Sequence, residues 1–401
     1  MRAVLQCICL LTAAVLVLGQ NPLKRPRAQK EPAVSGTEYG EPIQGIRGRE
    51  FEMFRLGLED FLEVEDAEEG LGPIFNGRSC AECHASPRIG GISTISEFRA
   101  GTLNPDGSFQ EPEGGTLIHL FSIPPHETQA VIPPGVNVVA RRRPLPLFGD
   151  GLVEAVPDEI LVALEDPEDL DEDGISGRVH WVTDKETGQL RAGRFGWKAM
   201  QSSLFTFGAE AYRNEMGITN ELFPNEMCPG GDCAIIELVD PVPDPEDGPE
   251  RSTGLRGIDN FANFMRLLGP PPRGEQNAET QRGEVLFGEI RCTACHVPSL
   301  TTGSSPIPAL SRKRFLPYGD FLLHDIGTGD GIQDGDASPV EIRTMPLWGL
   351  GVRAPFLHDG RAANIEQAIE FHSREAESSR LLYEELTEEQ RLDLLAFLKS
   401  L

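Results

Sequence analysis

The stretch CAECH at residues 80–84 returns as CTACH at residues 292–296, and these two Cys-x-x-Cys-His motifs decide the fold. Two thiols one helical turn apart can each add to a porphyrin vinyl group, and the adjacent histidine can then bind the iron as proximal ligand. With eight cysteines and eight histidines in 401 residues, a chance origin of both motifs is negligible. The sequence therefore predicts two covalently bound c-type haems with proximal ligands His84 and His296. The predicted thioether links are at Cys80, Cys83, Cys292 and Cys295.

Zinc and thiol-redox chemistry are the alternatives for such cysteine pairs. One zinc ion shared by both pairs would have to join segments about 200 residues apart, and it would leave the two histidines unexplained. A thioredoxin-like pair would follow a strand in a βαβ unit, which neither motif does. Haem attachment explains every residue of both motifs.

The N-terminus predicts an export signal. Met1 and Arg2 precede an apolar run that ends at Gly19, which suits a signal peptide of residues 1–19 cleaved near that glycine. A retained anchor is the alternative, although the run is short for a membrane span. Residues 20–45 follow as a linker. We expect a soluble periplasmic or otherwise extracytoplasmic protein with no stable membrane span.

Two cysteines of the expected mature chain lie outside the haem motifs. Cys228 and Cys233 enclose a short Pro-Gly-Gly-Asp loop. In an oxidising compartment a disulfide is the default for such a pair, and a redox-active dithiol is the alternative.

Composition limits the partners. The formal net charge of −27 repels nucleic acid and anionic lipid. The acidic surface is either simply solvated or attracts a basic redox partner. The 43 glycines and 32 prolines indicate long loops, which suits a fold wrapped around large cofactors.

The chain also repeats itself around the two motifs. A phenylalanine stands five residues before the first cysteine in each, and the segment 143–151 returns as 343–351. Apolar spacing predicts helices over 51–61 and 261–268, and a capped helix over 387–401. We expect a mainly α fold with two cytochrome-c-like haem domains in tandem, carrying long loops and insertions. The predicted domains are residues 46–255 and 256–401.

These motifs resemble a known family. The stretches FNGRSC at 75–80, GDGLVEA at 149–155, GRFGWKA at 193–199 and EMGIT at 215–219, with the run 343–372, are similar to bacterial di-haem cytochrome c peroxidases. They also resemble the di-haem enzymes that mature methylamine dehydrogenase. The chain looks most like the branch called di-haem oxidoreductases or thiol oxidoreductases. The resemblance covers nearly the whole expected mature chain.

The sixth iron ligands are less clear than the proximal ones. Ile365, Ile369 and His372 share one helical stripe, so His372 points inward, and the family resemblance puts a methionine ligand at that position. We expect His372 to ligate the second haem, with Met345 and His358 in reserve. A core histidine bonded to the backbone is the alternative. For the first haem, which we expect to keep an open iron site, His119 and His126 are weak candidates.

Two catalytic residues are implied by the resemblance. Glu215 corresponds to the family's distal acid, where a carboxylate could move protons as an O–O bond breaks. Trp197 resembles a tryptophan that relays electrons between the haems. An exposed glutamate and a packed tryptophan are the plainer alternatives. Phe207 stands near the family's distal glutamine position, which weakens the case for efficient peroxidase activity.

Calcium is the last metal considered. Asp169, Asp171 and Asp173 alternate before Gly174, as in the first half of a calcium loop. The usual closing glutamate is replaced by His180. The alternative is a solvated acidic turn, although the resemblance to calcium-containing di-haem enzymes favours the ion.

These observations predict an exported di-haem oxidoreductase of peroxidase type. It would pass electrons between its haems to hydrogen peroxide or a similar small oxidant. Its electron donor would be a small redox protein or a small molecule. The alternatives are a non-enzymatic electron-transfer protein and a thiol oxidoreductase that uses Cys228 and Cys233.

Overall fold

The computed structural model describes residues 33–123, 132–228, 233–240, 242–251 and 253–401. The expected signal peptide, the first half of the linker (residues 20–32) and His126 lie outside these residues. Helices account for 29% of the structure and strands for 14%, so the expectation of a mainly α fold was wrong. The fold is mixed, because the long segments between the helices form short strands that pair across large gaps in the sequence.

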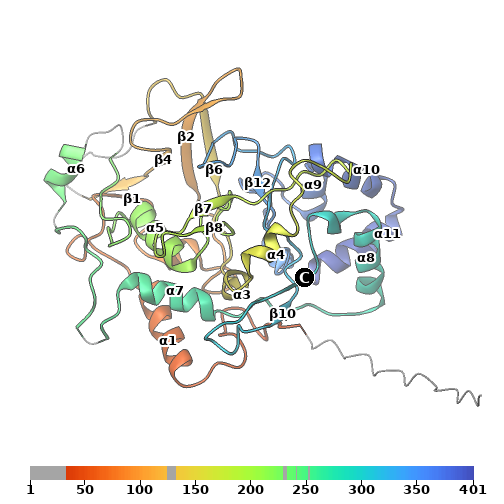
Figure 1. Ribbon diagram of the computed structural model, residues 1–401, viewed down its shortest axis with the longest axis horizontal. Helices are drawn as coiled ribbons and strands as arrows, with labels where there is room; N and C mark the ends of the chain where they lie inside the picture. The colour runs from red at the N-terminus through yellow and green to blue at the C-terminus, as the bar shows by residue number, and fades with distance from the viewer. Residues whose placement is uncertain (1–32, 124–131, 229–232, 241, 252) are drawn as a thin grey trace, which may run out of the picture. The chain divides into compact units, whose positions relative to one another are not determined.

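The elements follow one another along the chain with long connections (Figure 1). The helices are α1 (Arg49–Leu62), α2 (Cys80–Cys83), α3 (Asp150–Glu154), α4 (Asp158–Val162), α5 (Leu204–Met216), α6 (Cys233–Val239), α7 (Gly257–Leu267), α8 (Ala278–Glu289), α9 (Ile365–Glu370), α10 (Glu377–Glu384) and α11 (Glu388–Lys399), with 3-10 turns η2 (Cys292–Ala294), η3 (Leu350–Val352) and η4 (Arg374–Ala376). The strands are β1 (Ile74–Phe75), β2 (Glu97–Leu103), β3 (Phe109–Gln110), β4 (Leu117–Ile118), β5 (Phe121–Ser122), β6 (Val138–Arg142), β7 (Trp181–Thr183), β8 (Leu190–Ala192), β9 (Leu300–Thr301), β10 (Arg314–Phe315), β11 (Leu323–His324) and β12 (Ile342–Arg343).

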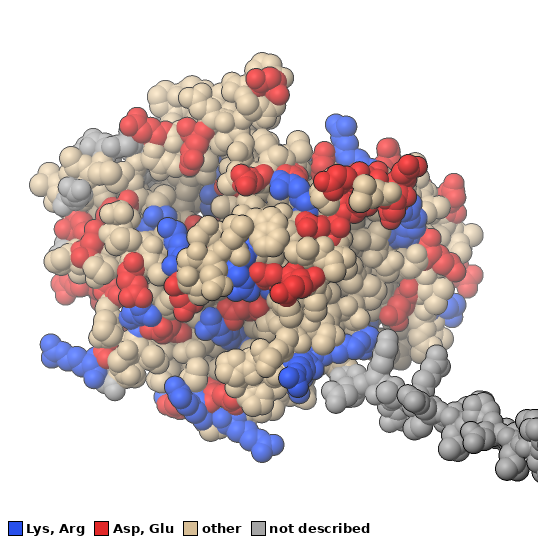
Figure 2. Space-filling model, in the orientation of Figure 1, with Lys and Arg blue, Asp and Glu red and all other residues tan. Residues whose placement is uncertain are grey.

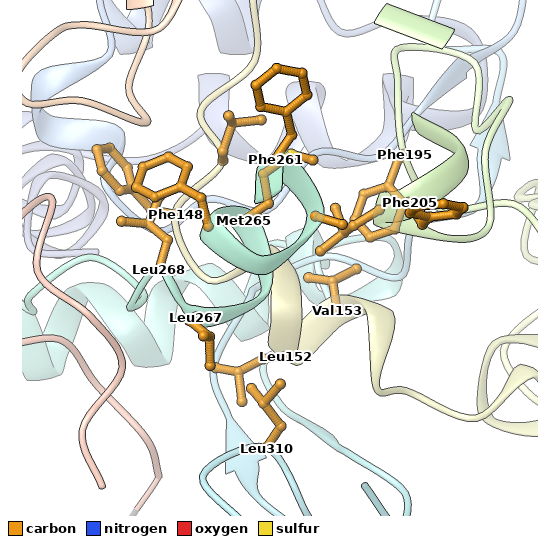
Figure 3. Packing of buried hydrophobic residues seen from close by; sticks show 14 of the residues in the cluster. Phe148, Leu152, Val153, Phe195, Phe205, Phe261, Met265, Leu267, Leu268 and Leu310 are labelled. Atoms are coloured by element: carbon orange, nitrogen blue, oxygen red, sulfur yellow. The ribbon is translucent and has the colours of Figure 1, made fainter. Parts of the chain in front are cut away.

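The helix before the first motif packs against α7. Phe61 on α1 lies 4.7 Å from Phe264 on α7, measured between ring centroids. The same core takes in α3 and α5, and Figure 3 shows its side chains around α7. The predicted helical stripes are confirmed here, except that Phe51 is 51% exposed. Burial of these apolar faces is the main source of stability for this helical core.

The helix before the second motif repeats this arrangement with α11 at the chain's end. Phe287 on α8 lies 5.4 Å from Phe397 on α11. The capping box predicted at Thr387 and Gln390 is formed at the start of α11. Each motif is thus preceded by a helix that packs against a helix from a later segment. The domain limit at residue 255 stays a prediction, although α7 shares its core with α1.

The largest sheet lies between the first motif and α3. Its central strand β2 pairs antiparallel with β6, β4 and β3 (Figure 1). Glu97 stands opposite Arg142 and Arg99 stands opposite Ala140 in the β2–β6 register. This sheet therefore brings together charged side chains from segments that lie more than 40 residues apart in the sequence.

Cys228 and Cys233 form a disulfide, as expected. Acidic and basic side chains are interspersed over the face drawn in Figure 2. Within the described ranges, no helix is both long enough and apolar enough to cross a lipid bilayer.

Candidate haem sites

The first motif forms the short helix α2, whose N-terminus is capped by the Ser79 side chain. Both of its cysteines carry free thiols. His84 Nδ1 lies 3.0 Å from the carbonyl oxygen of Gly91. A carbonyl oxygen accepts, so Nδ1 carries a proton in this contact. The backbone of Leu145 also bonds to the ring. Burial lowers the pKa of His84, which keeps the ring neutral.

The second motif has the same histidine geometry. His296 Nδ1 lies 3.1 Å from the carbonyl oxygen of Tyr318. Burial, followed by the nearby His372, lowers the pKa of His296 to about 4. Cys292 and Cys295 are also free thiols. Both motifs therefore present two thiols and one neutral imidazole whose Nδ1 is bonded to a backbone carbonyl oxygen, and c-type haem attachment requires two thiols and an imidazole of this kind.

A large cavity adjoins the second motif. His372 follows α9 and lines this cavity with His296. Its Nδ1 lies 2.7 Å from the carbonyl oxygen of Ala368, so its Nε2 is also left for a metal. The apolar walls include Phe287, Leu347, Leu350, Ile365, Leu394 and Leu398. Two imidazoles, two thiols and an apolar wall fit a haem.

The reserve ligands Met345 and His358 line the same cavity. His358 is buried, and its ring lies edge-on to Trp197 with 6.1 Å between ring centroids. In neither case does a contact distinguish the residue as a better ligand than His372. The assignment of His372 stays a prediction.

Glu215 lies at the end of α5, close to the first motif. Its Oε2 accepts a hydrogen bond of 2.9 Å from Asn76 Nδ2, and its side chain also contacts Glu97 on β2. Burial, followed by the charge of Glu97, raises the pKa of Glu215 to about 8. The negative charge of Glu215 in turn helps to raise the pKa of Cys83, so the carboxyl lies near the haem-attachment thiols. A carboxyl that holds its proton at neutral pH can act as an acid.

The other candidates near the first motif are differently placed. His119 is buried and its Nε2 donates to the Asn214 carbonyl oxygen at 2.9 Å. Burial lowers its pKa to about 4, so the ring is neutral. Phe207 on α5 stacks on Phe195 at 6.0 Å between ring centroids. An aromatic ring at this position supplies no hydrogen-bond donor.

Trp197 lines the cavity together with the residues of the second motif. Its indole N–H donates to the Arg143 carbonyl oxygen at 2.8 Å, which fixes the ring. The same cavity is lined by Ile92, which follows the Gly91 that binds His84. Trp197 therefore stands along a space that runs from the second motif to the neighbourhood of the first.

The carboxylates of the acidic turn at 169–173 lie in two separate groups. Oxygens of Asp166, Asp169 and Asp171 lie within 4.8 Å of one another. Asp173 instead pairs with Arg291, which directly precedes the second motif, at 2.5 Å. The expected set of Asp169, Asp171 and Asp173 is thus not gathered around one point, and calcium binding stays a prediction.

Sequence reasoning missed a buried histidine beside the second motif. His324 is 3% exposed and lies between Asp320 Oδ2 at 3.1 Å and Glu375 Oε2 at 2.8 Å. Burial opposes the charged ring, but the two carboxylates outweigh it and raise the pKa of His324 well above its usual value. Its ring also lies 3.8 Å from Cys295 Sγ. Asp320 lies only four residues before His324, but Glu375 and Cys295 reach the ring only through the fold.

Comparisons with known proteins agree with this geometry. The family model described as "Di-haem oxidoreductase, putative peroxidase" matches residues 133–401. The methylamine utilization protein MauG of Methylorubrum extorquens is 30% identical over 180 residues, which cover 38% of this chain and 46% of that protein. The match thus spans less than half the length of that relative.

Two solved structures are also similar. Hydrazine synthase of Kuenenia stuttgartiensis has 14% identity and a TM-score of 0.41, with 97% of this chain and 100% of that chain covered. The diheme peroxidase BthA of Burkholderia thailandensis has 15% identity and a TM-score of 0.41, with 87% and 86% covered. The family match covers most of the chain, including the second motif and the cavity. The chain therefore belongs to the di-haem oxidoreductase family.

Proposed function

We propose that this chain is an exported di-haem c-type oxidoreductase of peroxidase type, with two unlike haem sites. His84 would hold the first haem and leave its other face open to a small oxidant such as hydrogen peroxide. His296 and His372 would hold the second haem, which would receive electrons from a small redox protein or a small molecule. The disulfide and the expected signal peptide support a periplasmic or other extracytoplasmic location.

One observation carries the proposal. The second site pairs two neutral imidazoles with free Nε2 atoms in one apolar cavity. Near the first motif, Glu215 has a raised pKa and can act as an acid, and His119 is bonded to the backbone. Two nitrogen ligands suit electron transfer, whereas one ligand and a nearby acid suit reaction with an oxidant.

The chain's own residues would handle the protons. Bound haem irons supply one-electron redox chemistry. Glu215 would donate a proton to the departing oxygen as the O–O bond of the oxidant breaks. Asn76 orients that carboxyl through its amide. Trp197, fixed by Arg143, would lie on the path of electrons between the two sites.

Spectroscopy of the holoprotein tests this division of roles. We expect one low-spin haem with two nitrogen ligands and one haem that is high-spin or reacts with peroxide, at least after the second is reduced. Two low-spin haems in every redox state, without peroxide turnover, would instead identify an electron carrier. A second test replaces Cys228 and Cys233 by alanine, and unchanged activity would remove the thiol oxidoreductase alternative.

Calcium would be held by the Asp166–Asp171 side of the acidic turn, since Asp173 is already paired with Arg291. A bound divalent cation there would stiffen the segment that leads to Ser176, which contacts Glu375 beside the second motif. Removing calcium with a chelator should then lower the thermal stability of the holoprotein. An unchanged melting temperature would leave a solvated acidic turn as the explanation.

A further inference from the structure

Glu97 and Glu215 bring two carboxyl groups into contact close to the first motif. Glu97 lies on β2 and Glu215 ends α5, so the contact joins the sheet to the helical core. Asn76 donates to Glu215 from the other side. Two ionised carboxylates at hydrogen-bonding distance repel each other strongly, and a single proton held between them relieves the repulsion.

Glu97 is the first carboxylate of a ladder of ions that runs from the partly buried Glu97 and Arg99 to the buried Lys198. Arg99 and Arg142 reach Glu97, and the ladder continues to two aspartates and Lys198, which follows Trp197. The distances are 2.7 Å for Arg99–Glu97, 3.8 Å for Arg142–Glu97, 2.6 Å for Arg142–Asp334, 2.7 Å for Arg142–Asp330, 3.3 Å for Lys198–Asp330 and 3.7 Å for Arg99–Asp334.

The charges of this ladder balance only when Glu215 is neutral. It contains three cations, Arg99, Arg142 and Lys198, and three carboxylates, which are Glu97, Asp330 and Asp334. An ionised Glu215 would add a fourth negative charge to a buried group. An uncompensated buried charge is costly, so the balanced state is favoured.

We propose that Glu97 and Glu215 share one proton, and that Glu97 is the positioning residue that keeps this proton on Glu215. The ladder fixes the charge of Glu97, and that charge holds the acid next to it in its neutral form. This inference deepens the proposed function and rests on it, because it explains how the acid of the first haem site, Glu215, stays protonated at neutral pH. Burial opposes ionisation of Glu97, but Arg99 and Arg142 outweigh it and lower the pKa of Glu97.

Other titratable groups around the pair come from every neighbouring element. They are Arg99 on β2, Arg142 on β6, Cys83 on α2, His119 after β4, Glu210 and Arg213 on α5, and Asp334 after β11. His119 is neutral, because burial lowers its pKa to about 4. Burial raises the pKa of Glu210, which opposes a negative charge there, although Gln201 donates a hydrogen bond to its carboxyl group.

Infrared difference spectra of the full-length holoprotein at neutral pH test the shared proton directly. The spectrum of the wild type minus that of the Glu215→Gln variant should contain one band from a protonated carboxyl group. The wild type minus Glu97→Gln should contain the same band, because three cations and two carboxylates would favour an ionised Glu215. As a matched control, Glu210→Gln on the same helix should leave that band in place. Absence of the band from either of the first two spectra would overturn the inference.

A second measurement is the alkaline limb of the pH–rate profile, the pH range in which the rate of the peroxide reaction falls. Two variants should shift this limb in opposite directions. Glu97→Gln should move this limb to lower pH by at least about one unit, whereas Arg99→Gln should move it to higher pH. A general loss of structure would not shift the two variants in opposite directions. Shifts in the same direction, or none, would refute the role of Glu97. A wild type without peroxide turnover would sink the proposed function, while the infrared bands would still decide the shared proton.

Discussion

The two motif regions share one frame, a pair of helices packed beside the Cys-x-x-Cys-His motif. They differ in the residues that lie around the motif. In each, a phenylalanine of the preceding helix lies against the motif histidine, with 6.1 Å between the rings of Phe61 and His84 and 6.3 Å between those of Phe287 and His296. Next to the second motif lies an apolar cavity, which is also lined by His372. Near the first, the neighbours are a carboxyl pair and buried ions.

This difference teaches that attachment and reactivity are set by separate parts of the chain. The frame comes from the motifs and from the helix pairs α1–α7 and α8–α11, one beside each motif. The residues that would tune the irons lie on other elements, with Glu215 on α5 and His372 after α9. Variants can therefore remove one property while leaving the other, and four such experiments follow in decreasing order of expected effect.

The largest effect should come from removing the attachment thiols of one site. Replacing Cys292 and Cys295 by serine should halve the haem content per chain, because the second porphyrin loses both covalent links. The same change at Cys80 and Cys83 should remove the other haem. The pyridine haemochrome absorbance measures this content. Serines at Cys228 and Cys233 serve as the control and should leave two haems, and a full haem content in the Cys292 and Cys295 variant would disprove attachment there.

Next in size is the loss of the acid near the first motif. Glu215→Gln should slow the reaction with peroxide by about 10²–10⁴-fold, since general acid catalysis is worth that much. The wild-type rate should fall as the pH rises through about 8, because Glu215 then loses its proton. The low-spin spectrum of the second haem should stay unchanged, which excludes a general disturbance. Wild-type rates in the glutamine variant would remove Glu215 from the mechanism.

A smaller change is expected at the second site, in coordination alone. His372→Ala should convert the low-spin haem to a high-spin form, because one of the two nitrogen ligands is lost. Electron spin resonance of the oxidised protein records the conversion. His358→Ala is the matched control in the same cavity and should stay low-spin. If instead His358→Ala gave the high-spin form, the sixth ligand would be His358.

Much of the frame was predictable from sequence, and most of the surroundings were not. The motifs and the helices at 51–61, 261–268 and 387–401 depend on local spacing, which reads directly as structure. The fold class was wrong because most strands have only two or three residues, and the buried positions of the longest strand, β2, do not alternate, so no local pattern marks them. His324 and Glu97 were missed because a charged residue in a sequence looks like a surface residue. Only the fold reveals that their partners lie in distant segments.

The smallest expected effect concerns the shared frame itself. A Cβ added at Gly57 on α1 would lie 2.3 Å from the carbonyl oxygen of Asn260 on α7, and one at Gly283 on α8 would lie 2.1 Å from that of Asp393 on α11. Both helix pairs thus cross at a glycine, and alanine at either position must push the helices apart.

Each alanine should destabilise the protein by about 1–3 kcal/mol, the usual cost of overpacking. Gly288→Ala is the matched control on α8, where an added Cβ meets no atom within 4 Å, and it should stabilise the helix by about 0.5–1 kcal/mol. Chemical denaturation of the holoprotein measures all three. Equal losses at Gly57 and Gly283 would support one frame used twice. A loss at only one of them would mean that the two helix pairs tolerate separation differently, and the likeness of the halves would then end at the motifs.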